Sequence, residues 1–125
     1  MALRIRPKVD TKKRKAAYPG LVRVTQRLAQ VLQNGLPEPD YNRTLLDLDL
    51  AIIEAMECGE NGLVVLIETF AGRRNYYGYL APEAQVAAEI RSLRKRFPNH
   101  KITVKQGQDP EWALYSEYCD LFPWD

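Results

Sequence analysis

The sequence predicts an α+β protein in which two helices cover one face of an antiparallel sheet. Three observations lead to this prediction: a hairpin of two apolar strands, an amphipathic helix on each side of it, and a short alternating strand near the C-terminal end. The chain has 125 residues, 46% of them hydrophobic, which suits one domain with a real core. We assign residues 18–125 to this domain and residues 1–17 to a basic N-terminal arm.

The first element, LVRVTQRLAQVL at residues 21–32, fits two structures. As a helix it places Val24 and Leu28 on one face, together with other apolar residues. As a strand, its β-branched start alternates with Arg23 and Arg27. The sequence leaves both structures open at this point.

The segment YNRTLLDLDLAIIEAMECGENG, residues 41–62, is predicted to be a helix. It follows the turn-forming stretch NGLPEPDYN and stops at its glycines. The apolar residues spaced to form a buried stripe are Leu45, Leu48, Ile52 and Met56. The acidic residues assigned to the solvent-exposed side are Asp47, Asp49, Glu54 and Glu57.

Residues 62–80 are predicted to form a β-hairpin. The first strand, GLVVLIETF, is apolar at successive positions, as expected when both faces of a strand are covered. The short loop AGRRN leads into the returning strand YYGYL. As an exposed edge strand, LVVLIETF also offers a way for two copies of the chain to pair.

The remaining chain is predicted to form a helix, a strand and a final helix. APEAQVAAEIRSLRKRF has the strongest helical pattern of the sequence, with Pro82 near its start. Its buried stripe consists of Val86, Ile90, Leu93 and Phe97. KITVK is a short strand with Lys101, Thr103 and Lys105 on one face.

With a strand at residues 21–32, the order becomes strand, helix, strand, strand, helix, strand. This order is typical of a ferredoxin-like fold, an antiparallel sheet with two helices on one face. We expect this fold, with one further helix added at the C-terminal end. A helix at residues 21–32 is the structural alternative.

The added helix begins in the motif DPEWALY. Asp109 is expected to cap the helix, and Pro110 suits its first position. Glu111 complements the positive end of the helix dipole. Trp112 and Tyr115 fall on one apolar stripe, so we expect this helix to be docked on the sheet and the motif to be structural.

The net charge of +2 conceals an uneven distribution. Residues 1–20 carry seven basic side chains against one acidic, and the remaining residues carry eleven basic against fifteen acidic. A basic arm is suited to nucleic acid or an acidic partner, although it is also typical of a solvated tail. No segment is apolar for the roughly 18 residues that a membrane span needs, so we expect a cytoplasmic protein with reduced cysteines.

No catalytic or cofactor motif is present: the sequence lacks G-x-S-x-G, a Walker-type loop and G-x-G-x-x-G. His100 is the single histidine, so a zinc site of several histidines is excluded. A nucleophile–base pair would need Cys58 with His100, which we expect on different edges of the fold. The sequence therefore predicts a protein that is not an enzyme and holds no metal or cofactor.

The hairpin raises an RNA-binding alternative, because RNA-recognition domains stack bases on strand aromatics flanked by basic residues. The hairpin candidates for binding are Arg73, Arg74, Tyr76, Tyr77 and Tyr79. The arm candidates are Lys12, Lys13, Arg14 and Lys15. Tyrosines also favour strands for structural reasons, so the pattern alone does not decide between the two interpretations.

Three stretches together resemble the bacterial family known as domain of unknown function 695. The matching positions are Asn34, Gly35 and Pro37; Arg73, Arg74, Tyr76, Tyr77 and Tyr79; and Asp109, Pro110, Glu111, Trp112 and Tyr115. The similarity covers roughly residues 18–122. It implies a strand at LVRVTQRL and a ferredoxin-like fold related to the B-type regulators of ribonuclease E, and it supplies no catalytic residue.

The expected function is therefore binding rather than catalysis. By analogy with the ribonuclease regulators, the resemblance favours a regulatory module that binds another protein. An immunity protein that neutralises a toxin is one form of that function, and RNA binding is the alternative from a different class. An enzyme using Cys58 or Asp109 is the third class, and it requires a pocket that joins either residue to a base.

Overall fold

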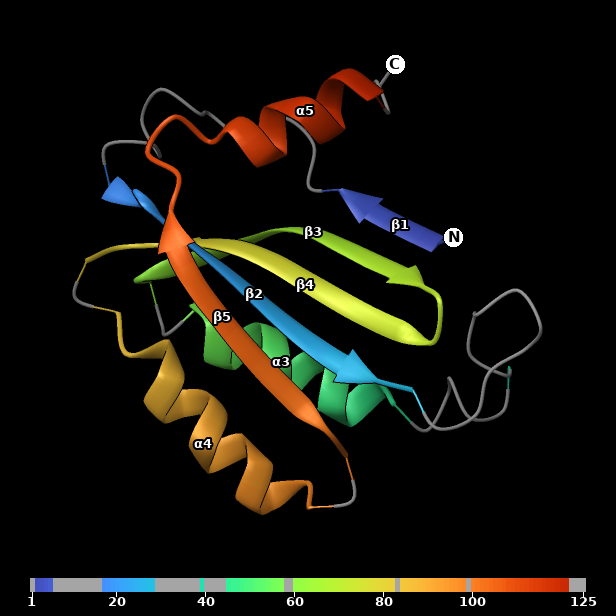
Figure 1. Ribbon diagram of the computed structural model, residues 1–125. Coiled ribbons are helices and arrows are strands. Elements are labelled where there is room, and N and C mark those ends of the chain that lie inside the picture. The colour runs from blue at the N-terminus through green and yellow to red at the C-terminus, as the bar shows by residue number, and fades with distance from the viewer. Residues whose placement is uncertain are drawn as a thin grey trace.

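The computed structural model describes residues 2–5, 17–28, 39, 45–57, 60–82, 84–98 and 100–121 (Figure 1). Within them the chain forms five strands and three helices. The strands are β1 (Ala2–Ile5), β2 (Gly20–Arg27), β3 (Gly62–Phe70), β4 (Arg73–Leu80) and β5 (Ile102–Gln108). The helices are α3 (Leu46–Glu57), α4 (Val86–Arg96) and α5 (Ala113–Leu121). None of these helices is both long and apolar enough to cross a membrane.

All five strands join one antiparallel sheet in the order β1-β3-β4-β2-β5. The elements from β2 to β5 follow the expected sequence of strands and helices. The sheet differs from the expected four-stranded ferredoxin-like sheet, because Ala2–Ile5 of the basic segment adds a fifth strand beside β3. The five-strand order is not the classic ferredoxin arrangement, and β3 is not an edge strand through which two copies could pair.

Residues 20–27 are a strand, so the helical alternative for this part of residues 21–32 is wrong. β2 lies between β4 and β5, and both neighbours hydrogen-bond its backbone. Its side chains alternate as the strand interpretation requires: Val22 and Val24 are fully buried, while Arg23 is only partly buried. Pairing with β4 and β5 thus fixes residues 20–27 as a strand, although the local sequence pattern fits both a helix and a strand.

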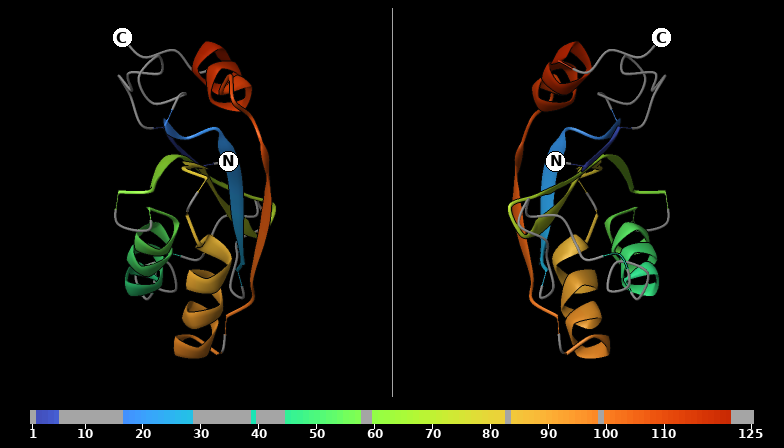
Figure 2. Two further views of the ribbon diagram at one scale, coloured as in Figure 1. Left: turned by 90° about the vertical axis from the view of Figure 1, so that its left-hand side faces the viewer. Right: turned by 90° about the vertical axis from the view of Figure 1, so that its right-hand side faces the viewer.

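The two faces of the sheet carry two separate hydrophobic clusters. α3 and α4 pack against each other and cover one face, which we call the helix face (Figure 2). The other face holds a cluster around Trp112, where α5 packs over one end of the sheet. A bulge between Val64 and Leu66 places Val65 beside Leu66 in this second cluster. The expected docking of the C-terminal helix is confirmed.

The expected buried stripe of α3 is confirmed: Leu45, Leu48, Ile52 and Met56 are all buried. The assignment of Asp49 to the solvent-exposed side is wrong, because this residue is only 6% exposed. Asp49 precedes Ile52 by three residues and Met56 by seven, so it lies on the same face of the helix as the apolar stripe. Its carboxylate is therefore carried into the protein.

The final helix begins later than expected. It starts at Ala113, and Pro110 lies in a preceding turn in which the Trp112 N–H donates to the Asp109 carbonyl at 2.9 Å. The capping role of Asp109 is confirmed, since its carboxylate accepts hydrogen bonds from the N–H groups of Ala113 and Leu114 at 2.9 and 3.1 Å. The turn lets one carboxylate reach two N–H groups of the first helical turn.

Candidate functional site

The five candidate residues of the hairpin are divided between the two faces of the sheet. Side chains alternate along β4, so Arg74 and Tyr76 lie on the helix face and are buried. Arg73, Tyr77 and Tyr79 lie on the opposite face. The structure thus does not gather the five into one surface. The arm candidates Lys12, Lys13, Arg14 and Lys15 lie outside the described residues.

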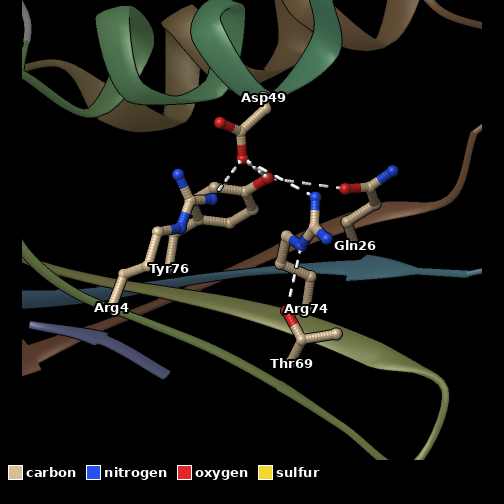
Figure 3. A network of polar contacts seen from close by, with 6 residues as sticks. All are labelled: Arg4, Gln26, Asp49, Thr69, Arg74 and Tyr76. Carbon is tan, nitrogen blue, oxygen red and sulfur yellow. Dashed lines mark hydrogen bonds and ion pairs between the residues drawn. The ribbon is translucent and has the colours of Figure 1, made fainter. Parts of the chain in front are cut away.

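On the helix face, Asp49 is the centre of a buried polar network (Figure 3). The Tyr76 hydroxyl donates to Asp49 Oδ1 at 2.7 Å, and the same oxygen forms ion pairs with Arg4 at 3.0 Å and Arg74 at 3.8 Å. Burial of its ring, followed by the charge of Asp49, raises the pKa of Tyr76 well above the ordinary 10.0. These contacts link α3 to β4 and to the added strand β1.

Two more side chains extend this network across the sheet. Arg74 Nε donates to the Thr69 hydroxyl at 3.1 Å, and Gln26 Oε1 lies 3.5 Å from the Tyr76 hydroxyl. Gln26 is fully buried, and its Nε2 has no hydrogen-bond partner among the residues that the structure describes. Asp49 Oδ1 is shared by one hydroxyl and two guanidinium groups, so this carboxylate joins α3 to β1 and β4.

The motif DPEWALY forms a second polar centre, under α5. The rings of Tyr79 and Trp112 stack with centroids 4.2 Å apart and planes at 9°, and Trp112 Nε1 donates to the Tyr18 carbonyl at 2.9 Å. The Tyr79 hydroxyl donates to Asp109 Oδ2 at 2.7 Å. Burial of Tyr79 and its hydrogen bond to Asp109 raise the pKa of that tyrosine. Asp109 therefore caps α5 and joins it to β4.

The backbone at Trp112 is in the left-handed region, with φ at 55°. This conformation is unfavourable for a bulky residue and persists only where the surroundings hold it. Full burial of Trp112, its stacking on Tyr79 and its edge-on contact with Tyr115 supply that support. The structural role expected for Asp109, Trp112 and Tyr115 fits this geometry.

Part of the sheet face opposite α3 and α4 is left uncovered by α5. The boundary is marked by Tyr118, whose hydroxyl donates to Glu68 Oε2 at 2.7 Å and whose ring is tilted against Tyr77 at 6.3 Å. The Asn75 amide makes two of these hydrogen bonds: its Nδ2 donates to Glu68 Oε1 at 3.2 Å, and its Oδ1 accepts from the Thr25 hydroxyl at 2.8 Å. Glu68 thus has both carboxylate oxygens engaged.

At this boundary, where Arg23 lies opposite Tyr77, and beyond it, the register brings cations together in two cross-strand rows. Arg27 on β2 lies opposite Arg73 on β4, and Arg23 on β2 lies opposite Lys105 on β5. All four side chains lie on the face opposite α3 and α4; Arg23 is half-buried and the others are exposed. We call these four residues the basic face. Within the described part of the chain, none of them forms an ion pair.

Of these four residues, the sequence makes only Arg73 a binding candidate, although it also places Lys105 with Lys101 and Thr103 on one face of a strand. The alternation in LVRVTQR puts Arg23 and Arg27 on one side of a strand. The alternation in KITVK likewise puts Lys105 on one side of its strand. These patterns supply the signal, but only the pairing of β2 with both β4 and β5 shows that the cations share a surface.

The described residues bear on only part of the metal and catalytic sites considered from the sequence. No group of three or more His, Cys, Asp or Glu side chains that could hold a metal ion occurs among them. The ring of His100 meets that of Phe97 edge-on at 6.4 Å. Cys58, the nucleophile considered for a pair with His100, lies outside the described residues.

Comparison with known proteins gives a family match. A family model described as a family of unknown function, DUF695, matches residues 2–119, and so begins within the segment assigned to the arm. No curated protein matches the chain. Among solved structures, the chain is similar to a hydantoinase/carbamoylase family amidase from Burkholderia ambifaria, with 18% identity and a TM-score of 0.35. That similarity covers 86% of this chain but only 33% of the amidase, and it carries no argument about activity.

Proposed function

We propose that this chain, which belongs to the DUF695 family of unknown function, is a non-enzymatic module that binds an acidic partner protein through its basic face. A regulator or an immunity protein would act by binding of this kind. We further propose that it works in the cytoplasm, where its cysteines would remain reduced. The observation that carries the proposal is the placement of Arg27 opposite Arg73 and of Arg23 opposite Lys105.

Like charges directly opposite each other in a sheet oppose folding, by roughly 0.2–1 kcal/mol per pair. Here two such pairs lie on one face, and Glu68 is the only acidic residue in the described strands of that face. Its carboxylate is already bonded to Asn75 and Tyr118. An acidic partner would neutralise the cations, so binding would remove a repulsion that the free protein carries.

The side chains around the basic face suit a protein partner. Arginine is enriched at protein interfaces because its guanidinium pairs with carboxylates through two hydrogen bonds. Base stacking would instead need exposed aromatic rings on the central strands. Of the central-strand tyrosines, Tyr76 and Tyr79 are buried, and Tyr77 is half-buried beside Tyr118.

RNA binding is the second candidate, supported by one observation. Phe70 is 54% exposed and lies opposite Arg73 in the pairing of β3 with β4. An exposed ring next to a guanidinium is one element of a single-strand binding surface. This candidate predicts binding to single-stranded RNA that weakens steeply as salt is added.

The test uses the full chain and a partner captured from cells and then purified. The double variant Arg27→Glu/Arg73→Glu reverses the charge of one row of the basic face. The matched control, Arg91→Glu/Lys95→Glu, changes two exposed cations of α4 by the same total charge. We expect the first variant to weaken binding at least about tenfold and the control to bind like the unmodified chain.

Equal binding by the two variants would contradict the proposal. Binding of single-stranded polyuridine by the unmodified chain, with loss in Phe70→Ala, would replace it with the RNA candidate. The arm is tested separately by changing Lys12, Lys13, Arg14 and Lys15 to glutamine. Truncation of residues 1–17 is unsuitable because it also removes β1 from the sheet.

A further inference from the structure

No other described strand pairs with the outer edge of β5. β5 is the last strand in the sheet order and, among the described strands, pairs only with β2. Its pairing runs from Ile102 to Gln108 without a bulge, and the strand contains no proline. Natural edge strands are usually protected by such interruptions or by a covering element. β1, at the opposite edge, has only four residues.

Two hydrogen bonds that flank the ladder establish which backbone groups of β5 are free. The Arg27 N–H donates to the Lys101 carbonyl, and the Asp109 N–H donates to the Pro19 carbonyl, each at 3.0 Å. Backbone groups alternate in direction along an antiparallel strand, so the odd-numbered residues of β5 point toward β2 and the even-numbered residues point outward. The outward carbonyl of Ile102 accepts from Arg94 Nε at 2.8 Å.

The outward groups that remain belong to Val104, Gln106 and Gln108. They have no hydrogen-bond partner among the described residues. A strand added alongside β5 would therefore find three consecutive positions at which to exchange backbone hydrogen bonds. These positions lie next to the basic face, because the side chain of Lys105 projects between Val104 and Gln106 onto that face.

The surroundings of this edge define two requirements for such a strand. On the side of the basic face, Lys105 and the exposed Lys101 border it, with Arg23 one strand further in. At its C-terminal end is a hollow of about 240 Å³, lined by Gln106, Gln108, Leu80 and Ala84 among others. Alternate residues of an added strand would thus face cations and a partly apolar hollow.

We propose that the bound partner contributes an extended acidic segment that pairs with β5 as a sixth strand of the sheet. Its carboxylates alternate with small apolar side chains: the carboxylates face Lys105 and the basic face, and the apolar side chains lie toward the hollow. This inference rests on the proposed binding function and names the form in which the partner binds. Backbone hydrogen bonds supply affinity, and the alternation supplies selectivity.

The charges along β5 favour an acidic partner segment over a second copy of the chain as the added strand. In an antiparallel pair of β5 strands, the two copies of Lys105 would approach each other, with Lys101 and Arg94 of both copies nearby. Such repulsion disfavours a dimer. An acidic segment converts the same charges into attraction.

The experiment measures the affinity of the full chain for a synthetic peptide that alternates glutamate with valine. Gln106→Pro removes one outward N–H without touching the bonds to β2, because proline is compatible with an edge position of this kind. Gln106→Val is the matched control, since it changes the same side chain and keeps the N–H. We expect the proline variant to bind about tenfold more weakly than the valine variant.

Amide hydrogen exchange provides the second measurement. Binding is expected to slow exchange at Val104, Gln106 and Gln108 while leaving Lys105 and Gly107 unchanged, since these already bond to β2. Equal affinity of the two Gln106 variants without this alternating protection would overturn the β5 inference. If Arg27→Glu/Arg73→Glu still weakened binding of the purified partner, the proposed function would nevertheless stand.

Two other results would also overturn the inference. One is failure of the alternating peptide to bind the unmodified chain at low salt. The other is concentration-dependent protection of the same three amides in the absence of peptide, which would identify a second copy as the occupant. Sedimentation of the free chain measures that outcome directly.

Discussion

Arg27 on β2 and Arg73 on β4 lie directly opposite each other on the sheet face that α5 leaves uncovered. Because like charges at such positions repel, we predict that Arg73→Glu raises the free energy of unfolding by about 0.5 kcal/mol, even though it reduces partner binding. Urea denaturation measures the change, and Arg73→Gln should give a smaller gain. A lower free energy of unfolding in Arg73→Glu would show that the Arg27–Arg73 pair does not destabilise the folded protein.

The buried network predicts a large effect at Asp49. Asp49→Asn removes the carboxylate that pairs with the guanidinium of Arg74, whose side chain is only 9% exposed. Removing one member of a buried pair costs about 3 kcal/mol, so we expect a loss of that size in urea denaturation. Arg4→Gln should cost less than about 1 kcal/mol, because the Arg4 side chain is 58% exposed.

Asp47→Asn is the control for the buried network, since Asp47 lies exposed in the first turn of the same helix. A change at Asp47 should alter stability by no more than about 0.5 kcal/mol. Similar losses for the two aspartates would mean that the Asp49 network contributes little to the fold.

The tyrosines predict a loss of stability in alkali. Burial raises the pKa of Tyr76, Tyr79 and Tyr118 above the ordinary 10.0, and each hydroxyl also donates to a carboxylate. The folded protein therefore keeps these protons at pH values where the unfolded chain releases them. The resulting stability is complete below about pH 10 and declines as the pH rises further.

Urea denaturation at a series of pH values from about 8 to 11 measures this decline. Tyr76→Phe and Tyr118→Phe each remove one titrating group, so the decline should be shallower in both variants. The same slope in the unmodified chain and the two variants would exclude these tyrosines as its cause.

Asp109 is predicted to hold α5 against the sheet. Asp109→Ala removes the acceptor for Tyr79 and for two backbone N–H groups of the helix, which should cost about 2 kcal/mol. Fluorescence of Trp112 in a Trp124→Phe background should also report greater solvent exposure. Ser116→Ala changes an exposed residue of the same helix and should have neither effect. Unaltered Trp112 emission in Asp109→Ala would argue against this role.

Much of the fold could be predicted because its periodic patterns are local. The hairpin and α4 stand out in the sequence, and Val86, Ile90 and Leu93 are buried as expected. β2 could not be assigned from its own residues, because its conformation depends on hydrogen bonds to β4 and β5. β1 was missed because four residues within a basic segment carry too little pattern to indicate a strand.

The candidate site was less predictable because it depends on pairing between distant strands. Reasoning from residue type assigned Asp49 to solvent, although its spacing from Ile52 and Met56 indicated the buried face. The same reasoning grouped Arg74 with Arg73. The alternation of side chains along β4 places these two residues on opposite faces of the sheet. The basic face needs the registers of three strands at once, and no single stretch of sequence contains that information.

The most direct test of the basic face is the affinity of the purified partner for Arg27→Glu/Arg73→Glu beside Arg91→Glu/Lys95→Glu. Both variants change the net charge equally, so any difference between them reports the location of the cations rather than their number. We predict that the first variant binds at least about tenfold more weakly and that the second binds like the unmodified chain. Equal affinities would contradict the claim that this face recognises the partner.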